Sequence, residues 1–385
     1  MVTRMKQYLA LAVILVAFVA AGCGPKAAPS TSVLDTPEYH YNQGLKFLDK
    51  DQGEDALREF QRAIDLDPKS PLGYIGKGLA LGKKGDFKPA LENMEKAKGL
   101  EKKGIEARIG MIRLLSMQRP KGWIGEAESE FKAASEKEPN SSRLNYYMAM
   151  AYKMDLDFDK AAGLFKKVLD LNQEFFGEAN AEWAVIQKIQ RAAPGSEIGK
   201  KIALIDKIDR ADVAALFDQE MNLEKLFTKR GPKTFDTSFK APTETTTQFS
   251  PETTVKMAAA TDITDHWLKP SIETILKLQV RGLEAGPNHK FEPDKLITKG
   301  EFAVMLEDIL IKVSGDEKLA TKFLGATSPF PDVRNDQYFF GAAMTATSRG
   351  FLEADKATGE FRPGDAVSGA DALLSIREFK NQLKF

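Results

Sequence analysis

Apolar residues recur at helical spacing through most of the chain, in short segments separated by glycine, proline or polar turns. One set of small and bulky positions returns after 34 residues: Gly44, Phe47, Ala56, Phe60 and Ala63 are matched by Gly78, Leu81, Ala90, Met94 and Ala97. Small residues let two helices approach closely, and bulky ones fill the remaining space. A fixed period of this length indicates stacked helix–turn–helix units. We therefore predict an all-α chain that contains an array of helix pairs.

Two further units continue the pattern. The third has Ala127, Phe131 and Ala134 before Pro139, with a longer turn near residues 118–123, and the fourth spans Tyr146 to Val168. The four units, residues 37–172, resemble the tetratricopeptide repeat. That resemblance implies a helical solenoid whose concave surface holds a peptide or a protein partner.

Four polar or aromatic residues of the repeats are candidates for the partner-binding groove. They are Asn42, Lys77, Asn145 and Tyr146. The alternative is that they are ordinary solvated positions on the first helices of their units, and the sequence leaves both interpretations open.

The beginning of the chain has the order of a secretory signal. Arg4 and Lys6 precede an apolar run at residues 8–21, which is shorter than the roughly 20 residues that a spanning helix needs and ends on small residues. Residues 19–22, Val-Ala-Ala-Gly, stand before Cys23, the one cysteine of the sequence, so no disulfide can form within the chain. Residues 1–22 are therefore predicted to be a signal peptide.

The same residues resemble the lipobox of bacterial lipoproteins, with Ala20 where leucine is usual. This resemblance implies lipid on Cys23 and attachment to a membrane of the cell envelope. The periplasmic face of the outer membrane is the favoured location. Residues 23–36 are polar and small, and we expect a flexible spacer there.

A different pattern begins after the repeats. Residues 173–227 are helical in pattern, and residues 228–260 are rich in Thr, Pro, Ser and Lys, which is typical of a linker. Residues 261–313 and 329–385 then share landmarks in the same order. In the first they are Trp267, Gly282, Phe291-Glu-Pro293 and Thr298-Lys-Gly-Glu301, and in the second Tyr338, Gly350, Phe361-Arg-Pro363 and Ser368-Gly-Ala-Asp371.

These landmarks resemble the surface-layer homology domain, a helical module. The family usually assembles three units into a body with approximate threefold symmetry, so residues 173–227 are a candidate degenerate first unit. The aromatic position, Trp267 in one unit and Tyr338 in the next, could be a platform for a ligand. In a helical module such a residue is more often part of the core.

Three helix starts in this region carry a polar residue followed three positions later by an acidic one. The pairs are Thr298 with Glu301, Ser368 with Asp371, and Asp209 with Asp212 before a predicted helix at residues 213–227. Each predicts a capping box, which satisfies free backbone N–H groups at the helix start. The alternative to any binding role is that these are only capped helices.

A helix N-terminus attracts anions, and Arg210 and Lys299 stand just inside two of the caps. In the surface-layer family the corresponding arginine helps to hold an acidic cell-wall glycan, often one bearing a ketal-linked pyruvate. The resemblance therefore implies glycan binding by Arg210, Lys299, Thr298 and Trp267. Gly369 occupies the corresponding position just inside the third cap, so no cation is present there.

The composition argues against several other functions. Basic and acidic residues balance at 55 each, so the sequence predicts no binding of nucleic acid. The three histidines, His40, His266 and His289, are scattered, and no pattern predicts a metal, a cofactor or an active site.

The sequence therefore predicts a non-catalytic envelope lipoprotein that binds peptidoglycan or an acidic wall polymer and docks an unidentified protein on its repeats. The alternative is an assembly factor that works through its repeats alone, with the C-terminal module as a structural support.

Overall fold

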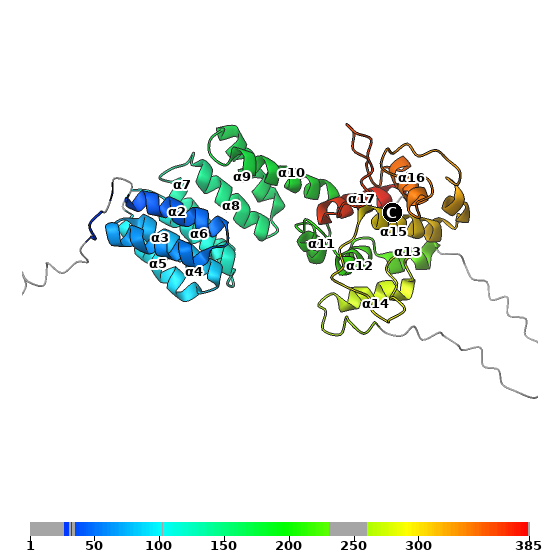
Figure 1. The fold of residues 1–385 in the computed structure, drawn as a ribbon, viewed down its shortest axis with the longest axis horizontal. Helices are drawn as coiled ribbons and strands as arrows, with labels where there is room; N and C mark the ends of the chain where they lie inside the picture. Colours follow the sequence, from blue (N-terminus) through cyan, green and yellow to red (C-terminus); the bar gives the residue numbers. More distant parts are fainter. Residues whose placement is uncertain (1–26, 31, 33–34, 102, 231–259, 384–385) are drawn as a thin grey trace, which may run out of the picture. The chain divides into compact units, whose positions relative to one another are not determined.

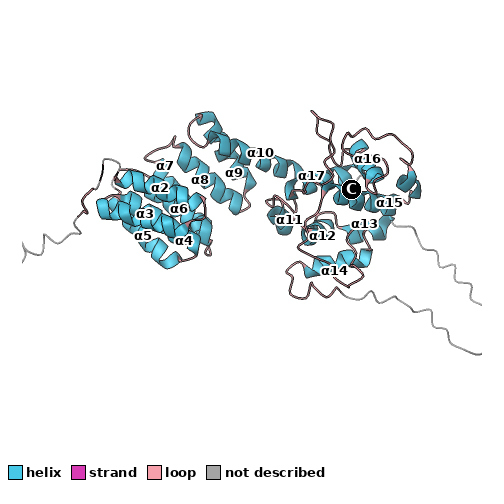
Figure 2. Ribbon diagram, in the orientation of Figure 1, coloured by secondary structure: helices cyan, strands magenta, loops and turns pink. Residues whose placement is uncertain are grey.

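The computed structural model describes residues 27–30, 32, 35–101, 103–230 and 260–383. Helices are the regular elements of these residues, joined by loops and by two isolated β-bridges (Figure 2). The prediction of an all-α fold is confirmed. The chain divides into two compact units at Trp183 and Ala184, and Cys23 and the signal lie outside the described residues. No described helix combines the length and apolar character that crossing a bilayer requires.

Four helix pairs make up most of the first unit (Figure 1). They are α2 (Pro37–Asp49) with α3 (Gly53–Leu66), α4 (Pro71–Lys84) with α5 (Phe87–Leu100), α6 (Glu106–Gln118) with α7 (Trp123–Ser135), and α8 (Ser142–Met154) with α9 (Phe158–Leu171). Within each pair the two helices pack together, and the first helices also contact one another from pair to pair. The repeat solenoid predicted from the 34-residue period is therefore confirmed, and α10 (Phe176–Ala192) follows it.

Local signals in the sequence set the helix boundaries. The hydroxyls of Thr36 and Ser141 accept hydrogen bonds from backbone N–H groups at the starts of α2 and α8. Gly85, with φ of +90°, ends α4 in a conformation that favours glycine. Residues 119–122 connect α6 to α7, whereas residues 85–86 suffice between α4 and α5, so the predicted longer turn is present.

The small and bulky positions of the repeat explain how the helices approach. Phe60 is fully buried, and its ring lies between Gly44 of α2 and Gly76 of α4. A Cβ atom at Gly44 would be 2.4 Å from the nearest atom of this ring, and one at Gly76 would be 2.1 Å away. The Phe60 ring fits between these two helices because the glycines that face it carry no side chain.

The second unit contains helices of unequal length. They are α11 (Glu197–Ile202), α12 (Arg210–Gln219), α13 (Leu223–Arg230), α14 (Lys269–Leu278), α15 (Lys299–Ser314), the 3₁₀ helix η1 (Glu317–Thr321), α16 (Phe340–Ser348) and α17 (Gly369–Gln382). Among them α12 packs on α14, α15 on α16, and α17 on both α11 and α12. The single helix predicted at residues 213–227 is wrong, because the chain leaves the helix after Gln219 and Asn222 takes a φ of +56° before α13.

Three segments of the second unit meet in a closed cycle of backbone hydrogen bonds. The Ile297 N–H donates to the Ile208 carbonyl at 3.0 Å, the Val367 N–H to Ile297 at 3.2 Å, and the Ile208 N–H to Val367 at 2.9 Å. Each of these residues stands just before a helix, namely α12, α15 or α17. The cycle brings together three helix starts that are far apart in the sequence.

Candidate functional site

The helix starts on the cycle carry the predicted caps, with one difference. At α12 the Asp209 carboxylate accepts from the Asp212 N–H at 2.8 Å, and the Asp209 N–H donates back to Asp212 at 3.2 Å. At α15 the Thr298 and Glu301 side chains make the same two bonds. Both capping boxes are therefore confirmed.

The third cap, at α17, is only half of a box. The Ser368 hydroxyl accepts from the Asp371 N–H at 3.1 Å. The Asp371 carboxylate does not reach back to the Ser368 backbone N–H, but accepts from the Ser368 hydroxyl and pairs with Lys188 at 2.7 Å. Lys188, near the end of α10, thus contacts the start of α17.

Burial changes the electrostatics of the α12 cap. Asp212 is 6% exposed, and its desolvation, with the nearby charge of Asp209 as a smaller cause, raises the pKa of its carboxyl group to about 6. The pKa of Asp209 is also raised, chiefly by burial. Two acidic groups therefore share one helix start in a partly dry environment.

Arg210 is committed to the interior of the second unit. Its Nε donates to the Phe291 carbonyl at 2.7 Å, and its terminal nitrogens donate to the carbonyls of Gly282 at 2.5 Å and Glu284 at 2.9 Å. The residue is 9% exposed, and burial lowers the pKa of its guanidinium. The side chain holds the loop at residues 282–291 against α12, so its predicted role in glycan binding stays a prediction that this geometry does not favour.

Lys299 contacts the corresponding loop of the next segment, with one hydrogen bond to a backbone carbonyl. Its Nζ donates to the Glu353 carbonyl at 2.6 Å and lies 4.7 Å from the centre of the Phe361 ring. The residue is half-buried, and burial lowers the pKa of its ammonium group. At the third position a Cβ on Gly369 would be 1.7 Å from the Ile202 carbonyl oxygen. The missing cation there has a steric reason.

A groove of about 920 Å³ opens beside Lys299. Its walls come from the end of α10, the loop after α16 and the helix α17, and its basic residues are Lys188, Arg191, Lys299, Lys356 and Arg377. Lys188 and Lys356 pair with the groove's own carboxylates, Asp371 and Glu353. Sequence reasoning missed Lys188, Arg191 and Arg377, because only the fold brings α10 and α17 beside Lys299.

The aromatic position of the two similar units is exposed. Trp267 is 61% exposed and Tyr338 is 67% exposed, so the interpretation of these residues as core is wrong. Neither residue lines the groove beside Lys299. The structure therefore does not bring Trp267 together with Lys299, and its role in binding stays a prediction.

The two similar segments, residues 261–313 and 329–385, each hold a loop in place with an aspartate near their start. The Asp262 carboxylate accepts from the N–H groups of Phe291 and Glu292 at 2.8 and 2.7 Å. In the second of these segments, the Asp332 carboxylate accepts from the N–H groups of the equivalent residues, Phe361 and Arg362, at 2.8 and 2.6 Å. The shared landmarks of the sequence thus correspond to shared hydrogen bonds.

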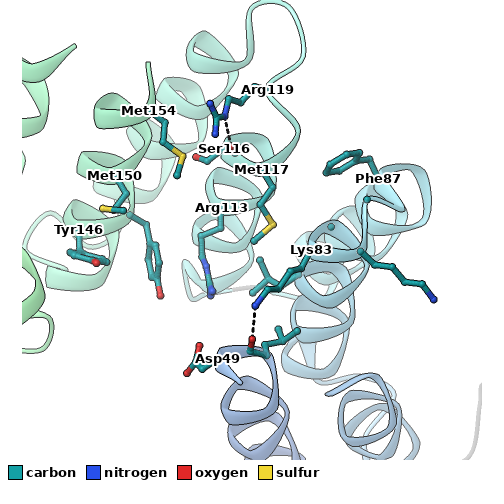
Figure 3. Close-up of a pocket in the computed structure, with 16 residues that line it drawn as sticks. Asp49, Lys83, Phe87, Arg113, Ser116, Met117, Arg119, Tyr146, Met150 and Met154 are labelled. Carbon is teal, nitrogen blue, oxygen red and sulfur yellow. Dashed lines mark hydrogen bonds between the residues drawn. The ribbon is translucent and has the colours of Figure 1, made fainter. Parts of the chain in front are cut away.

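The first unit contains a second candidate site, a cavity of about 670 Å³ between helices of successive repeats (Figure 3). Much of its lining is flexible and apolar, with Met117, Met150 and Met154 together with Leu79 and Tyr146. Met117 and Met154 are 39% and 37% exposed, which is high for large apolar side chains. We call this the large repeat cavity.

A smaller cavity of about 120 Å³ adjoins it, and Arg113 and Tyr147 line both. Burial raises the pKa of Tyr41, in the small cavity, and of Tyr146, in the large one, to about 12 in each case. The positive charge of Arg113 acts in the opposite direction on both hydroxyls. One cation therefore influences both repeat cavities.

The structure separates the four residues predicted for the partner groove. Tyr146 lines the large repeat cavity and Asn42 the small one. Lys77 donates to the Gln61 side chain at 2.9 Å, and Asn145 is 1% exposed, with its amide nitrogen donating to the Ser141 carbonyl. Asn145 is therefore not a solvated position. Their role in partner binding stays a prediction. Nothing in the sequence distinguishes Arg113 from other charged residues of the repeats.

The described residues hold no group of three or more His, Cys, Asp or Glu side chains placed to bind a metal ion.

The family model of the S-layer homology domain matches residues 329–373, which contain α16 and the start of α17. S-layer homology domains bind cell-wall polymers, and this match associates the chain with the cell envelope.

The chain is also similar to part of a mammalian DnaJ homolog. It is 30% identical over 118 residues to human DnaJ homolog subfamily C member 3, and 32% identical over 103 residues to the mouse protein. These matches cover 31% and 27% of this chain but only 23% and 20% of the relatives, so the chain spans less than a quarter of their length.

Solved structures give weaker similarities. A thermophilic TPR protein of Thermus thermophilus is 19% identical, with a TM-score of 0.36, covering 50% of this chain and 96% of the other. Yeast Tom70 is 21% identical, with a TM-score of 0.30 and coverage of 44% of each chain. The repeat architecture rests on the helix pairs themselves.

Proposed function

We propose that this protein is a non-catalytic envelope lipoprotein that links a membrane to the cell wall and docks a protein partner on its repeats. The observation that carries the proposal is the S-layer homology match at residues 329–373, which includes one wall of the basic groove beside Lys299. In this proposal lipid on Cys23 holds the chain to the periplasmic face of the outer membrane. The groove binds peptidoglycan or an attached acidic polymer.

The groove has the chemistry for a polyanion with spaced carboxylates. Arg191 and Arg377 are exposed there and make no ion pair with described residues, and Lys299 has one carbonyl partner. Arginine matches a carboxylate with two parallel hydrogen bonds, and lysine offers a point charge. The groove's carboxylates, Asp365 and Glu378 among them, would repel polymer segments whose charges are out of register.

The wall-binding part is tested by sedimentation with purified sacculi. Full chain carrying Cys23→Ser should sediment with sacculi that keep their acidic polymers and sediment less once these are removed. The double variant Arg191→Gln and Arg377→Gln should weaken binding about tenfold through loss of charge-assisted bonds. Lys277→Gln, an exposed change elsewhere in the second unit, is the control. Unchanged sedimentation of the double variant would remove this part of the proposal.

Arg210→Ala is a poor test of binding, because it removes three internal hydrogen bonds and would loosen the unit whatever the ligand.

The membrane part is tested separately by feeding cells a labelled fatty acid. Wild type should take up the label and fractionate with outer membrane. Cys23→Ser should do neither.

One observation favours a second function, an assembly factor whose C-terminal unit is a support. Arg210, the residue that the family resemblance assigned to the glycan, is turned inward. Site-specific cross-linkers on the repeats would then capture the same partner in wild type and in the Arg191 and Arg377 variant, and neither protein would sediment with sacculi.

A further inference from the structure

Arg113 of α6 lines both repeat cavities and has no charged partner among the residues that the structure describes. Among the residues that the structure describes, no hydrogen bond or ion pair reaches its guanidinium, which lies 4.5 Å from the centre of the Tyr147 ring. The neighbouring cations are engaged: Lys83 pairs with Asp51, and Lys84 pairs with Glu54. Arg119 is exposed at the rim and donates to the Ser116 carbonyl. Figure 3 shows Arg113 directed into the large repeat cavity.

On one side of Arg113 the large cavity is mostly apolar, with Leu79, Met117 and Met150. On the other side the small cavity combines Ile75, Ile109 and the ring of Phe175 with the ion pair of Glu106 and Arg143. A half-buried guanidinium that lacks hydrogen bonds has lost part of its hydration without compensation. A carboxylate would supply two parallel hydrogen bonds and the opposite charge.

The position of the charge limits the ligand further. Because Arg113 and Tyr147 line both cavities, a carboxylate bound at Arg113 has space lined in part by apolar residues on either side of it. The side of about 670 Å³ accepts several side chains, and the side of about 120 Å³ accepts little more than one. Such a ligand carries its acidic group within the chain, not at its end.

We propose that the concave face of the repeats binds a peptide segment with an internal aspartate or glutamate, flanked on both sides by apolar residues, whose carboxylate pairs with Arg113. This inference rests on the proposed docking function and names its ligand chemistry. The longer apolar flank fills the large cavity, and the shorter one enters the small cavity. Methionines line the large cavity, and their flexible side chains adapt to different apolar groups, so Arg113 sets most of the specificity.

The test is a selection of short random peptides displayed on phage, with their C-termini fused to the coat protein. Displayed in this way they have no free C-terminal carboxylate, so an acidic group can come only from a side chain. The bait is the full chain with Cys23→Ser. Enriched peptides should carry aspartate or glutamate between apolar residues. A selection that enriches peptides without an acidic residue, or no peptides, would overturn the inference.

One enriched peptide, made with a fluorescent label, then measures the role of the cation. Arg113→Gln should weaken its binding about tenfold or more, and Arg113→Lys should weaken it less because the charge remains. Arg58→Gln, an exposed arginine of α3 that lines neither cavity, is the matched control and should stay within about twofold. Met150→Asp should also abolish binding, because it places a repelling charge in the cavity. Equal binding by wild type and Arg113→Gln would contradict the proposal.

Helical content and thermal melting of each variant by circular dichroism identify any that fail to fold. The result is separable from the proposed function. If cross-linking captures a partner on the repeats equally well in Arg113→Gln, docking stands and the acidic-peptide inference falls. If the peptides bind as expected but sacculi do not sediment the chain, the inference stands and wall binding falls.

Discussion

At the scale of single residues, the two carboxylates at the start of α12 make stability depend on pH. Asp212 has a pKa of about 6 in the folded protein, above its ordinary value near 4, because burial disfavours the charged form. The folded state therefore holds a proton that the unfolded state releases more easily. The stabilising contribution is present below the ordinary pKa and is lost as pH rises through about 6.

We expect Asp212→Asn to remove this dependence. Asparagine can still accept from the Asp209 N–H but carries no charge, so the capping bond remains. Wild type should lose on the order of 1–2 kcal/mol of unfolding free energy between about pH 4 and pH 6 through this group, and the variant should not. Urea unfolding followed by circular dichroism across that range measures the difference. Asp206→Asn, exposed and near the same helix, controls for the loss of an acidic group.

The sequence predicted which residues cap these helices but not where the adjacent cations point. Capping is a local matter of three residues, so Thr298 and Glu301 could be read directly. Arg210 instead bonds to carbonyls of residues 282–291, and nothing near position 210 indicates those partners. The exposure of Trp267 was missed for the same reason, since it depends on which elements fail to cover it.

At the scale of elements, the α15 cap can be tested by changing one hydroxyl. Thr298→Ala removes the acceptor for the Glu301 N–H and should lower the free energy of unfolding by about 0.5–2 kcal/mol. Thr298→Ser keeps the hydroxyl and should stay close to wild type. Because Thr298 is also a predicted glycan residue, sacculus binding of Thr298→Ser should be unaffected if its role is capping. Equal stability of the alanine and serine variants would argue against the cap.

The contact of α4 with Phe60 gives a second prediction. Gly76→Ala would place a methyl group 2.1 Å from an atom of the ring, and we expect a loss of about 1–3 kcal/mol because the packed interior cannot yield. Gly99→Ala is the matched control. It lies on a helix with no atom within 4 Å of the new methyl group and should stabilise the repeats by about 0.5–1 kcal/mol. Thermal melting of both variants decides between these outcomes.

The helices of the repeats were predictable because their signal is periodic and their contacts are mostly between neighbours. Glycines and alanines at fixed offsets imply close helix pairs, and the structure has them at Gly44, which faces Phe60, and at Gly78, which faces Met94. The break between α12 and α13 was not predictable, because apolar residues continue through it at helical spacing. Only the φ of Asn222 reveals the interruption.

At the scale of the whole molecule, each unit is stabilised by its own kind of internal contact. The first is a stack in which each helix touches its neighbours along the chain. The second depends on the cycle through Ile208, Ile297 and Val367. A local change should therefore weaken the stack gradually, whereas one at the cycle should affect the whole second unit.

Gly369→Ala should break the second unit alone. Its methyl group would overlap the Ile202 carbonyl at 1.7 Å, so α17 could not dock and the unit should lose at least about 3 kcal/mol. Gly364→Ala, where nothing lies within 4 Å, should be nearly neutral. Hydrogen exchange should show faster exchange in residues 184–230 and 260–383 of Gly369→Ala and unchanged protection of the helix pairs. Loss of protection in both units would contradict this view.

The hydrogen-bond cycle also sets an order of events during synthesis. The Ile208 N–H has its acceptor only after Val367 has been made. The cycle of the second unit therefore cannot be completed until nearly the whole chain has been synthesised. The helix pairs, by contrast, can form one after another. A chain truncated after residue 360 should accordingly show protected amides in the helix pairs and unprotected ones in α12. Until its last helix has been made, the second unit of this protein lacks the third member of the cycle and remains an open chain.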